Sequence, residues 1–165
     1  MNTRKRILSI CLVVAVVFGM TGCVDSEKQD RLIQFINEDL AEEFKLESEA
    51  NDLYAQNTGD NFKGDEELYN ALTETVIPNY EKMIAGASDI DLGEFTEFSE
   101  LKSLIIQYWS KKKEAFEKIC DAIEQQNETM IEEGNTLLSN AETIYEKFKN
   151  ERDKLYEEYN VTTKE

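Results

Sequence analysis

The residues able to do chemistry are few, because the chain of 165 residues has three cysteines and no histidine. Without histidine, the sequence cannot form a Ser-His-Asp or Cys-His nucleophile pair, an HExxH zinc site or an axial-histidine haem site. Asp and Glu number 35 against 18 Lys and Arg, so paired carboxylates alone do not indicate catalysis. The net charge of −17 argues against nucleic acid as a partner. We therefore expect no enzymatic activity and no cofactor.

One acidic segment matches part of a calcium-binding loop. Asp89, Asp91 and Glu100 stand at positions one, three and twelve of such a loop. The pattern fails at position five, which is Gly93, and at position six, where a calcium loop needs glycine and this chain has Glu94. Asp89, Asp91 and Glu100 are weak metal candidates, since an acidic connection before a helix explains them equally well. We predict no metal site.

The basic cluster Lys111-Lys112-Lys113 fits either phosphate binding or a solvated helix face. We expect the solvated face, because Lys113 and Glu117 are four residues apart and pair on a helix. Lys112 falls on the apolar stripe, and its side chain is long enough to carry the charge out to water.

Trp109 and Cys120 also have two interpretations. Trp109 follows Tyr108 on an apolar stripe and fits either a ligand groove or, as we expect, the core. Cys120 adjoins Ile119, which favours a small buried hydrophobe over a redox centre.

The N-terminus has the features of a secretory signal. A basic segment is followed by an apolar run of 14 residues, which is too short to span a bilayer as a mature helix. The sequence Met20-Thr21-Gly22-Cys23 closes this run, with small residues directly before a cysteine, and polar, acidic sequence begins soon after it.

This segment resembles the lipobox of bacterial lipoproteins, in which the cysteine receives a diacylglycerol and signal peptidase II cuts directly before it. The resemblance implies cleavage between Gly22 and Cys23, and a lipid-modified mature N-terminus at Cys23. Met20 and Thr21 depart mildly from the commonest box. The alternatives are an ordinary secretory signal and an uncleaved anchor.

Cleavage at this point would make the chain still more acidic. Three basic residues leave with the signal, so the mature chain would carry 15 basic and 35 acidic residues, a net charge of −20. Such a surface is repelled by anionic lipid, so the acyl chains would have to hold the protein to the membrane.

The mature part shows helical periodicity throughout, with apolar residues at steps of three and four. The pattern predicts helices over 26–56, 65–85, about 95–125 and about 128–159, and glycine-bracketed loops at 57–64 and 86–93. The third and fourth helices carry the densest stripes, which include Phe116 and Leu137.

Three details of these helices can be checked against a structure. Pro78 should kink the second helix at Ile77 without ending it. Glu47 and Glu49 fall where the first stripe thins, so we expect loose packing there. The last two helices form either one rod of about 97 Å or, as we expect, a hairpin that reverses near 125–128 with Asn127 as N-cap.

The sequence therefore predicts an all-α protein, an antiparallel bundle of about four helices after a cleaved signal peptide. Its regions are a signal peptide at 1–22, a lipidated N-terminus with a short tether at 23–29, and the bundle domain at 30–160. The bundle is also similar to the small helical lipoproteins of uncharacterised function in Gram-positive bacteria. That likeness rests on Tyr69, Ile77-Pro78 and Tyr80 and on the long helical hairpin, and it implies no activity.

Three classes of function remain. The first is a lipid-anchored, extracytoplasmic binding or scaffold module for another envelope protein. The second is an immunity-like or sensor accessory that binds a basic secreted partner. The third, a small-ligand carrier or enzyme, is the least favoured. The expected partners are membrane lipid, reached through an acylated Cys23, and an unidentified protein, with no nucleic acid. The expected location is the outer face of the cell membrane.

Overall fold

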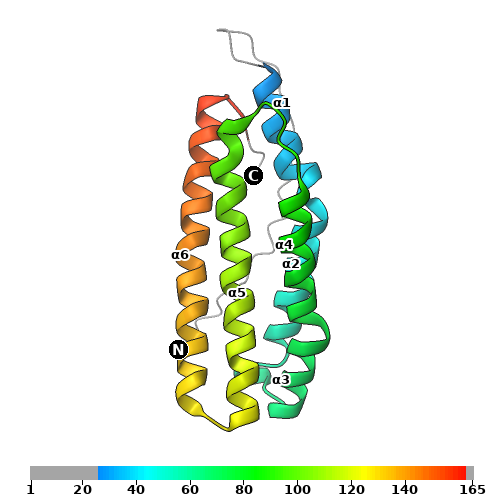
Figure 1. Cartoon of the computed structure of the whole chain (residues 1–165), viewed down its shortest axis with the longest axis vertical. Coiled ribbons are helices and arrows are strands. Elements are labelled where there is room, and N and C mark those ends of the chain that lie inside the picture. Colours follow the sequence, from blue (N-terminus) through cyan, green and yellow to red (C-terminus); the bar gives the residue numbers. More distant parts are fainter. Residues whose placement is uncertain (1–25, 163–165) are drawn as a thin grey trace.

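The computed structural model describes residues 26–162, which form a bundle of four antiparallel rods without a strand in that range. The first rod comprises α1 (Ser26–Gln34), η1 (Phe35–Asp39) and α2 (Ala41–Ala55), and the second comprises α3 (Asp65–Ala71), η3 (Leu72–Val76) and α4 (Ile77–Asp89). The other two rods are α5 (Ser99–Gln125) and α6 (Glu128–Glu158), which lie side by side in Figure 1. The predicted all-α bundle is confirmed.

The last two helices form a hairpin, as predicted, rather than one rod. α5 ends at Gln125, and Gln126 adopts the left-handed conformation with a φ of 50°. Asn127 then caps α6, because its side-chain oxygen accepts a hydrogen bond from the backbone N–H of Thr129 at 3.1 Å.

The second rod passes Pro78 by way of a π-helical turn. This turn, η3, ends at Val76, and Pro78 lies in the first turn of α4, where its missing N–H is tolerated. Ile77 keeps a helical backbone, with a φ of −59° and a ψ of −47°. The helix therefore continues past Pro78, as expected, and the irregular turn precedes Ile77.

The predicted loop at 86–93 was wrong in its first half. α4 continues through Gly86 to Asp89, and the connection that follows contains the short turn η4 (Thr96–Phe98) before α5. Gly86 lies inside the helix, and its lack of a side chain leaves space for a side chain from the neighbouring rod. A Cβ there would collide with a carboxylate oxygen of Glu43 on α2.

The core runs the length of the bundle. Its largest fully buried side chains include Trp109, Tyr80, Phe35, Phe98, Phe116 and Phe148. Among the described helices, α5 contributes the most buried residues, in agreement with its predicted stripe. α6 contributes fewer, and its Leu137 is only half-buried. The fourth stripe is therefore less densely packed than the sequence predicts.

Candidate functional site

The end of the bundle nearest the predicted anchor is held by contacts from α1. Cys23 and Gly22 lie outside the described residues, and α1 begins at Ser26. Its Lys28 forms an ion pair with Glu97 at 2.9 Å, which joins α1 to the turn η4 before α5.

Two further contacts join α1 to the segment after α6. The ammonium of Lys28 lies 6.0 Å from the centre of the Tyr159 ring. The side-chain amide of Gln29 donates to the backbone oxygen of Asn160 at 3.0 Å. The first and last parts of the bundle are therefore fastened together.

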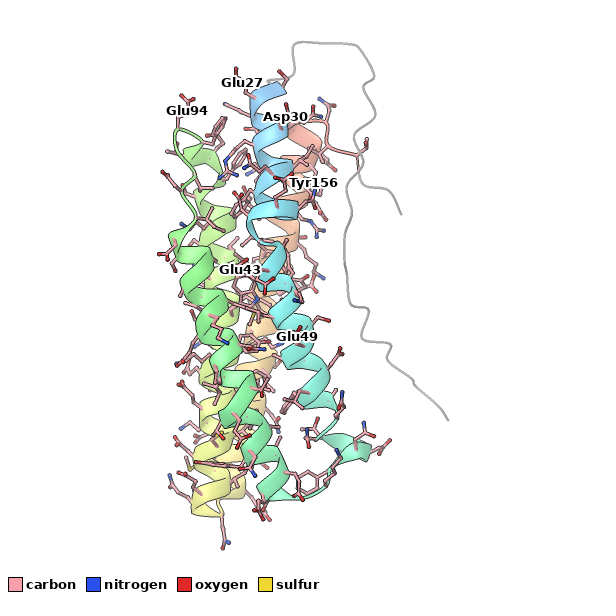
Figure 2. All side chains as sticks on the ribbon, turned by 90° about the vertical axis from the view of Figure 1, so that its right-hand side faces the viewer. Glu27, Asp30, Glu43, Glu49, Glu94 and Tyr156 are labelled. Atoms are coloured by element: carbon pink, nitrogen blue, oxygen red, sulfur yellow. The ribbon has the colours of Figure 1, made fainter. Side chains whose placement is uncertain are left out.

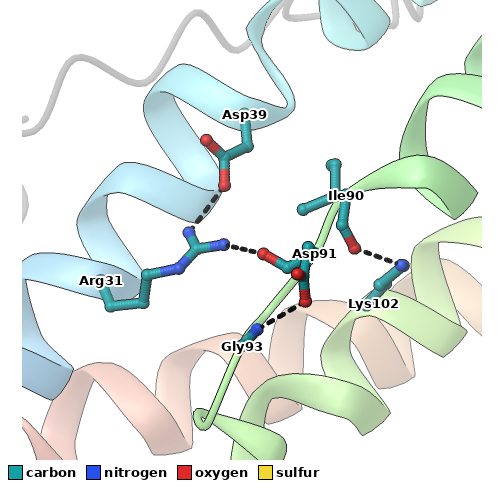
Figure 3. Close-up of polar contacts among 6 residues, drawn as sticks. All are labelled: Arg31, Asp39, Ile90, Asp91, Gly93 and Lys102. Atoms are coloured by element: carbon teal, nitrogen blue, oxygen red, sulfur yellow. Dashed lines mark hydrogen bonds and ion pairs between the residues drawn. The ribbon is translucent and has the colours of Figure 1, made fainter.

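Arg31 connects α1 to two other segments, as Figure 3 shows. Its Nη1 donates to Oδ2 of Asp39 at 2.6 Å, and its Nη2 donates to the backbone oxygen of Asp91 at 2.9 Å. The Arg31 side chain is 13% exposed, so this ion pair is better shielded than a surface pair. We call Arg31, Asp39 and Asp91 the Arg31 latch, because they fasten α1 to η1 and to the connection after α4.

The connection after α4 is itself well fixed. The Asp91 carboxylate accepts a hydrogen bond from the N–H of Gly93 at 2.8 Å, and Gly93 has a φ of 59°, which favours glycine. Lys102 Nζ donates to the backbone oxygens of Ser88 and Ile90 at 2.7 and 2.6 Å. A hollow of about 410 Å³ lies against this connection, lined by Arg31, Gln34, Asp39, Ile90 and Asp91.

The structure does not assemble the weak metal candidates into a site. Asp89 is the last residue of α4, Glu100 lies in the first turn of α5, and Asp91 is committed to the turn and the latch. Within residues 26–162, no three Asp, Glu or Cys side chains gather as a group that could hold a metal ion. The guanidinium of Arg31 also places a positive charge beside Asp91, which disfavours a cation there.

A second polar group lies inside the bundle and centres on Lys112. The expectation that Lys112 reaches water was wrong, because the residue is only 7% exposed. Its Nζ donates to Oδ1 of Asn51 at 2.6 Å and lies 3.9 Å from a carboxylate oxygen of Glu47. The Tyr80 hydroxyl donates to the same Asn51 oxygen at 3.1 Å, and Lys112 lies 5.4 Å from the centre of the Tyr108 ring. We call these five residues the buried polar cluster.

Glu47 lies in the thin part of the first stripe, where the apolar side chains of Leu53 and Tyr54 are only partly buried. It is 9% exposed, and its Oε2 accepts a hydrogen bond from Nε1 of Trp109 at 3.1 Å. Trp109 is fully buried, which confirms its prediction as a core residue, and its ring meets that of Phe44 edge-on at 6.0 Å. Polar pairing therefore replaces apolar contact where the stripe of α2 thins.

Burial changes the acid–base behaviour of the buried polar cluster. Burial lowers the pKa of Lys112 below its usual range, although the carboxylates of Glu47 and Glu142 act in the opposite direction. Burial raises the pKa of Tyr80 and Tyr108, and the negative charge of Glu47 adds to the rise. The hydroxyls of Tyr80 and Tyr108 therefore stay protonated, and Lys112 holds its proton less firmly than a surface lysine does.

The neighbours of Lys112 behave as the sequence predicts. Lys111 forms an ion pair with Glu114, and Lys113 pairs with Glu117 at 2.7 Å and with Glu81 at 3.5 Å. The basic cluster is therefore two paired surface lysines around one buried lysine.

Cys120 is 7% exposed, and burial raises the pKa of its thiol to about 11. A thiol with so high a pKa is a poor nucleophile near neutral pH, in agreement with its prediction as a small hydrophobe.

Glu43 is a buried carboxyl that the sequence did not single out. It is 9% exposed, and its Oε2 has no hydrogen-bond partner in the structure. Glu43, labelled in Figure 2, lies on α2. Its carboxylate lies against Gly86 of α4, where a Cβ would collide with it. Desolvation by burial raises its pKa, and the negative charges of Glu42 and Asp39 add to the rise.

The connection between α2 and α3 presents an aromatic side chain to solvent. Phe62 is 51% exposed and is the one large hydrophobic residue exposed among residues 26–162. It follows η2 (Gly59–Asn61), in a connection at the end of the bundle away from the start of α1 (Figure 1). The sequence gives a partial signal here, because Phe62 is the one aromatic residue in a segment of turn-forming residues.

The chain matches no known protein family, no curated protein and no solved structure. None of the helices described is long and apolar enough to cross a membrane.

Proposed function

We propose that this chain is a lipid-anchored, extracytoplasmic lipoprotein that acts as a non-catalytic binding module for another envelope protein. The observation that carries the proposal is where the bundle begins. α1 starts at Ser26, only three residues after Cys23, at one end of the long axis of the bundle (Figure 1). A lipid on Cys23 would therefore hold that end at the membrane and leave the sides and the opposite end open to a partner.

The contacts of α1 support this role. The Arg31 latch, the ion pair of Lys28 with Glu97, and the hydrogen bond from Gln29 all join α1 to other parts of the bundle. A helix joined in this way fixes the point where the tether would attach relative to the rest of the bundle. This suits a module that positions a partner relative to the membrane.

The charge of the chain favours one kind of partner. A mature chain with a net charge of −20 attracts a basic protein and repels the anionic surface of a membrane. The immunity-like or sensor alternative, with a basic secreted partner, makes the same electrostatic demand. A small-ligand carrier is the remaining alternative, and the hollow beside the Arg31 latch is the feature that favours it.

The anchor is tested by labelling cells that express the full chain with radioactive palmitate. We expect label on the wild-type chain and none on Cys23→Ala, together with accumulation of the uncleaved precursor of the variant. Cys120→Ala is the matched control, since it removes another cysteine and should keep the label. Label that persists on Cys23→Ala would refute the lipoprotein assignment.

A further inference from the structure

We infer that the connection between α2 and α3 is the partner-binding surface of this protein, with the Phe62 ring as its anchor, and that the partner is a protein with an apolar pocket rimmed by Lys and Arg. The inference rests on the proposed binding function and adds the surface and the chemistry of the partner. It does not depend on how the chain is anchored.

The backbone of this connection is fixed before any partner arrives. The Asn57 side chain donates to the backbone oxygen of Leu53 at 2.8 Å, and Asn57 is 6% exposed. Two more side chains donate to backbone oxygens of α2, Thr58 to Tyr54 at 2.9 Å and Asn61 to Ala55 at 3.1 Å. These bonds fasten the connection to the last turns of α2.

The backbone of Phe62 is fixed by a hydrogen bond within this connection, whereas its ring is exposed. Its N–H donates to the backbone oxygen of Gly59 at 3.2 Å, which completes the short turn η2. Gly59 and Gly64 have φ values of 60° and 138°, so the chain turns sharply on both sides of Phe62. An aromatic side chain on a fixed backbone loses little conformational entropy on binding, which favours such residues as interface anchors.

The surroundings of Phe62 decide which partner fits. The Glu67 side chain folds back over Gly64, two residues from Phe62, since a Cβ on Gly64 would lie 2.8 Å from its Oε2. An exposed apolar ring in a segment rich in exposed carboxylates is complementary to an apolar pocket with a basic rim. The segment 57–67 contains four exposed carboxylates and one exposed lysine, which are Asp60, Asp65, Glu66, Glu67 and Lys63.

The neighbouring end of α5 extends the acidic surface. The Tyr69 hydroxyl on α3 donates to Oε1 of Glu124 at 2.6 Å, which brings the last turn of α5 against α3. Asp121 and Glu128 add exposed carboxylates near this end of the hairpin. A membrane is the poorer occupant for the same exposed ring, because carboxylates are repelled by anionic lipid.

The surface is tested by site-specific photo-crosslinking of the full chain in its own cells. A benzophenone amino acid replaces Phe62 in one chain and Asn140, an exposed residue in the middle of α6, in the control chain. We expect a protein adduct at position 62 at least tenfold stronger than at position 140, and a crosslinked segment rich in Lys and Arg. An adduct no stronger than the control, or a crosslinked segment that is acidic, overturns the inference.

The chemistry is then tested with the purified full chain and the crosslinked protein. Phe62→Ser should raise Kd at least tenfold, Phe62→Trp should keep it within threefold, and Lys63→Ala should not weaken binding. Raising salt from 50 to 300 mM should weaken binding roughly tenfold, as expected for a complex led by charge. If Phe62→Ser has the same Kd as the wild type, or if binding is insensitive to salt, the inference about this surface is refuted. Binding of the wild type, but not of Phe62→Ser, to vesicles of anionic lipid would instead identify a membrane-binding surface and also refute it.

The two proposals fail in different ways. If Cys23→Ala keeps its palmitate label, the assignment of Cys23 as the lipid anchor is wrong, and the predicted effect of the Phe62 variants on Kd still stands. If the Phe62 variants bind normally while Cys23 carries the lipid, the anchor stands and the binding surface lies elsewhere.

Discussion

Lys112→Ala should destabilise the bundle by about 3–5 kcal/mol, the range for removing one partner of a buried ion pair. The change deletes the hydrogen bond to Asn51 at 2.6 Å and the charge that lies 3.9 Å from Glu47. Glu47 would then lie at 9% exposure without its nearby cation, supported by neutral donors such as the Trp109 N–H. The uncompensated buried charge, rather than the loss of packing, is the main cost.

Lys113→Ala is the matched control, because it removes the neighbouring lysine from the same helix. Lys113 pairs with Glu117 and Glu81 at a surface where all three side chains are partly solvated, so its removal should cost only about 0.3–1 kcal/mol. Urea unfolding of both variants, followed by circular dichroism and by the fluorescence of the single tryptophan, gives the two free energies of unfolding.

A double variant separates charge from packing. Lys112→Met keeps most of the side-chain volume, and adding Glu47→Gln removes the carboxylate that would otherwise be left without its cation. We expect the double variant to recover most of the stability that Lys112→Met loses alone. If Lys112→Ala unfolds within about 1 kcal/mol of the wild type, far below the cost of breaking a buried pair, then Lys112 reaches water and the reasoning is refuted.

Three further predictions concern the core and the second buried carboxyl. Phe116→Ala should cost about 3–5 kcal/mol and Leu137→Ala much less, because Phe116 is 1% exposed whereas Leu137 is half-buried; equal losses in urea unfolding would contradict the packing described. Gly86→Ala should lower the melting temperature, since its Cβ has no room beside Glu43, and an unchanged value would show that Glu43 moves aside at no cost. Burial raises the pKa of Glu43 above 4.5 in the folded protein, so protonation of Glu43 stabilises the fold fully below pH 4.5 and this stabilisation is lost as pH rises through the folded pKa. Glu43→Gln should remove this part of the pH dependence of the free energy of unfolding. A pH profile identical to that of the wild type would contradict the prediction.

The helices and the hairpin could be predicted because their signals are local. Apolar residues spaced three and four positions apart identify a helix, and Asn127 marks the start of a helix by its residue type and its immediate neighbours. The core role of Trp109 follows from the same local pattern.

The buried polar cluster could not be predicted because its members are far apart in sequence. Lys112 and Glu47 each look like a polar interruption of an apolar stripe, and they lie 65 positions apart in the sequence. Only the packing of α5 against the first rod shows that the two interruptions face each other. The same holds for Glu43 and Gly86, where a helical glycine, usually a sign of a loop, makes room for a buried carboxyl on another rod.

The π-helical turns make the first two rods tolerant of a change in length that a regular helix would not survive. Leu68, Leu72, Val76 and Tyr80 are all buried and follow one another at steps of four. In a regular α-helix each step of four overshoots a full turn by about 40°, so three such steps would carry the stripe about 120° around the axis. The wider turn η3 takes up part of this drift, because it holds one residue more than an α-helical turn.

That extra residue marks a place where the chain can lose one position. Deleting the exposed Glu74 from η3 would leave the same four side chains at steps of four, three and four, which a regular α-helix keeps on one face. Deleting one residue from the middle of α5 would instead rotate everything after it by about 100° and turn its stripe away from the core. Single-residue insertions and deletions among relatives of this chain should therefore gather at η1, at η3 and in the connections, and should spare α5.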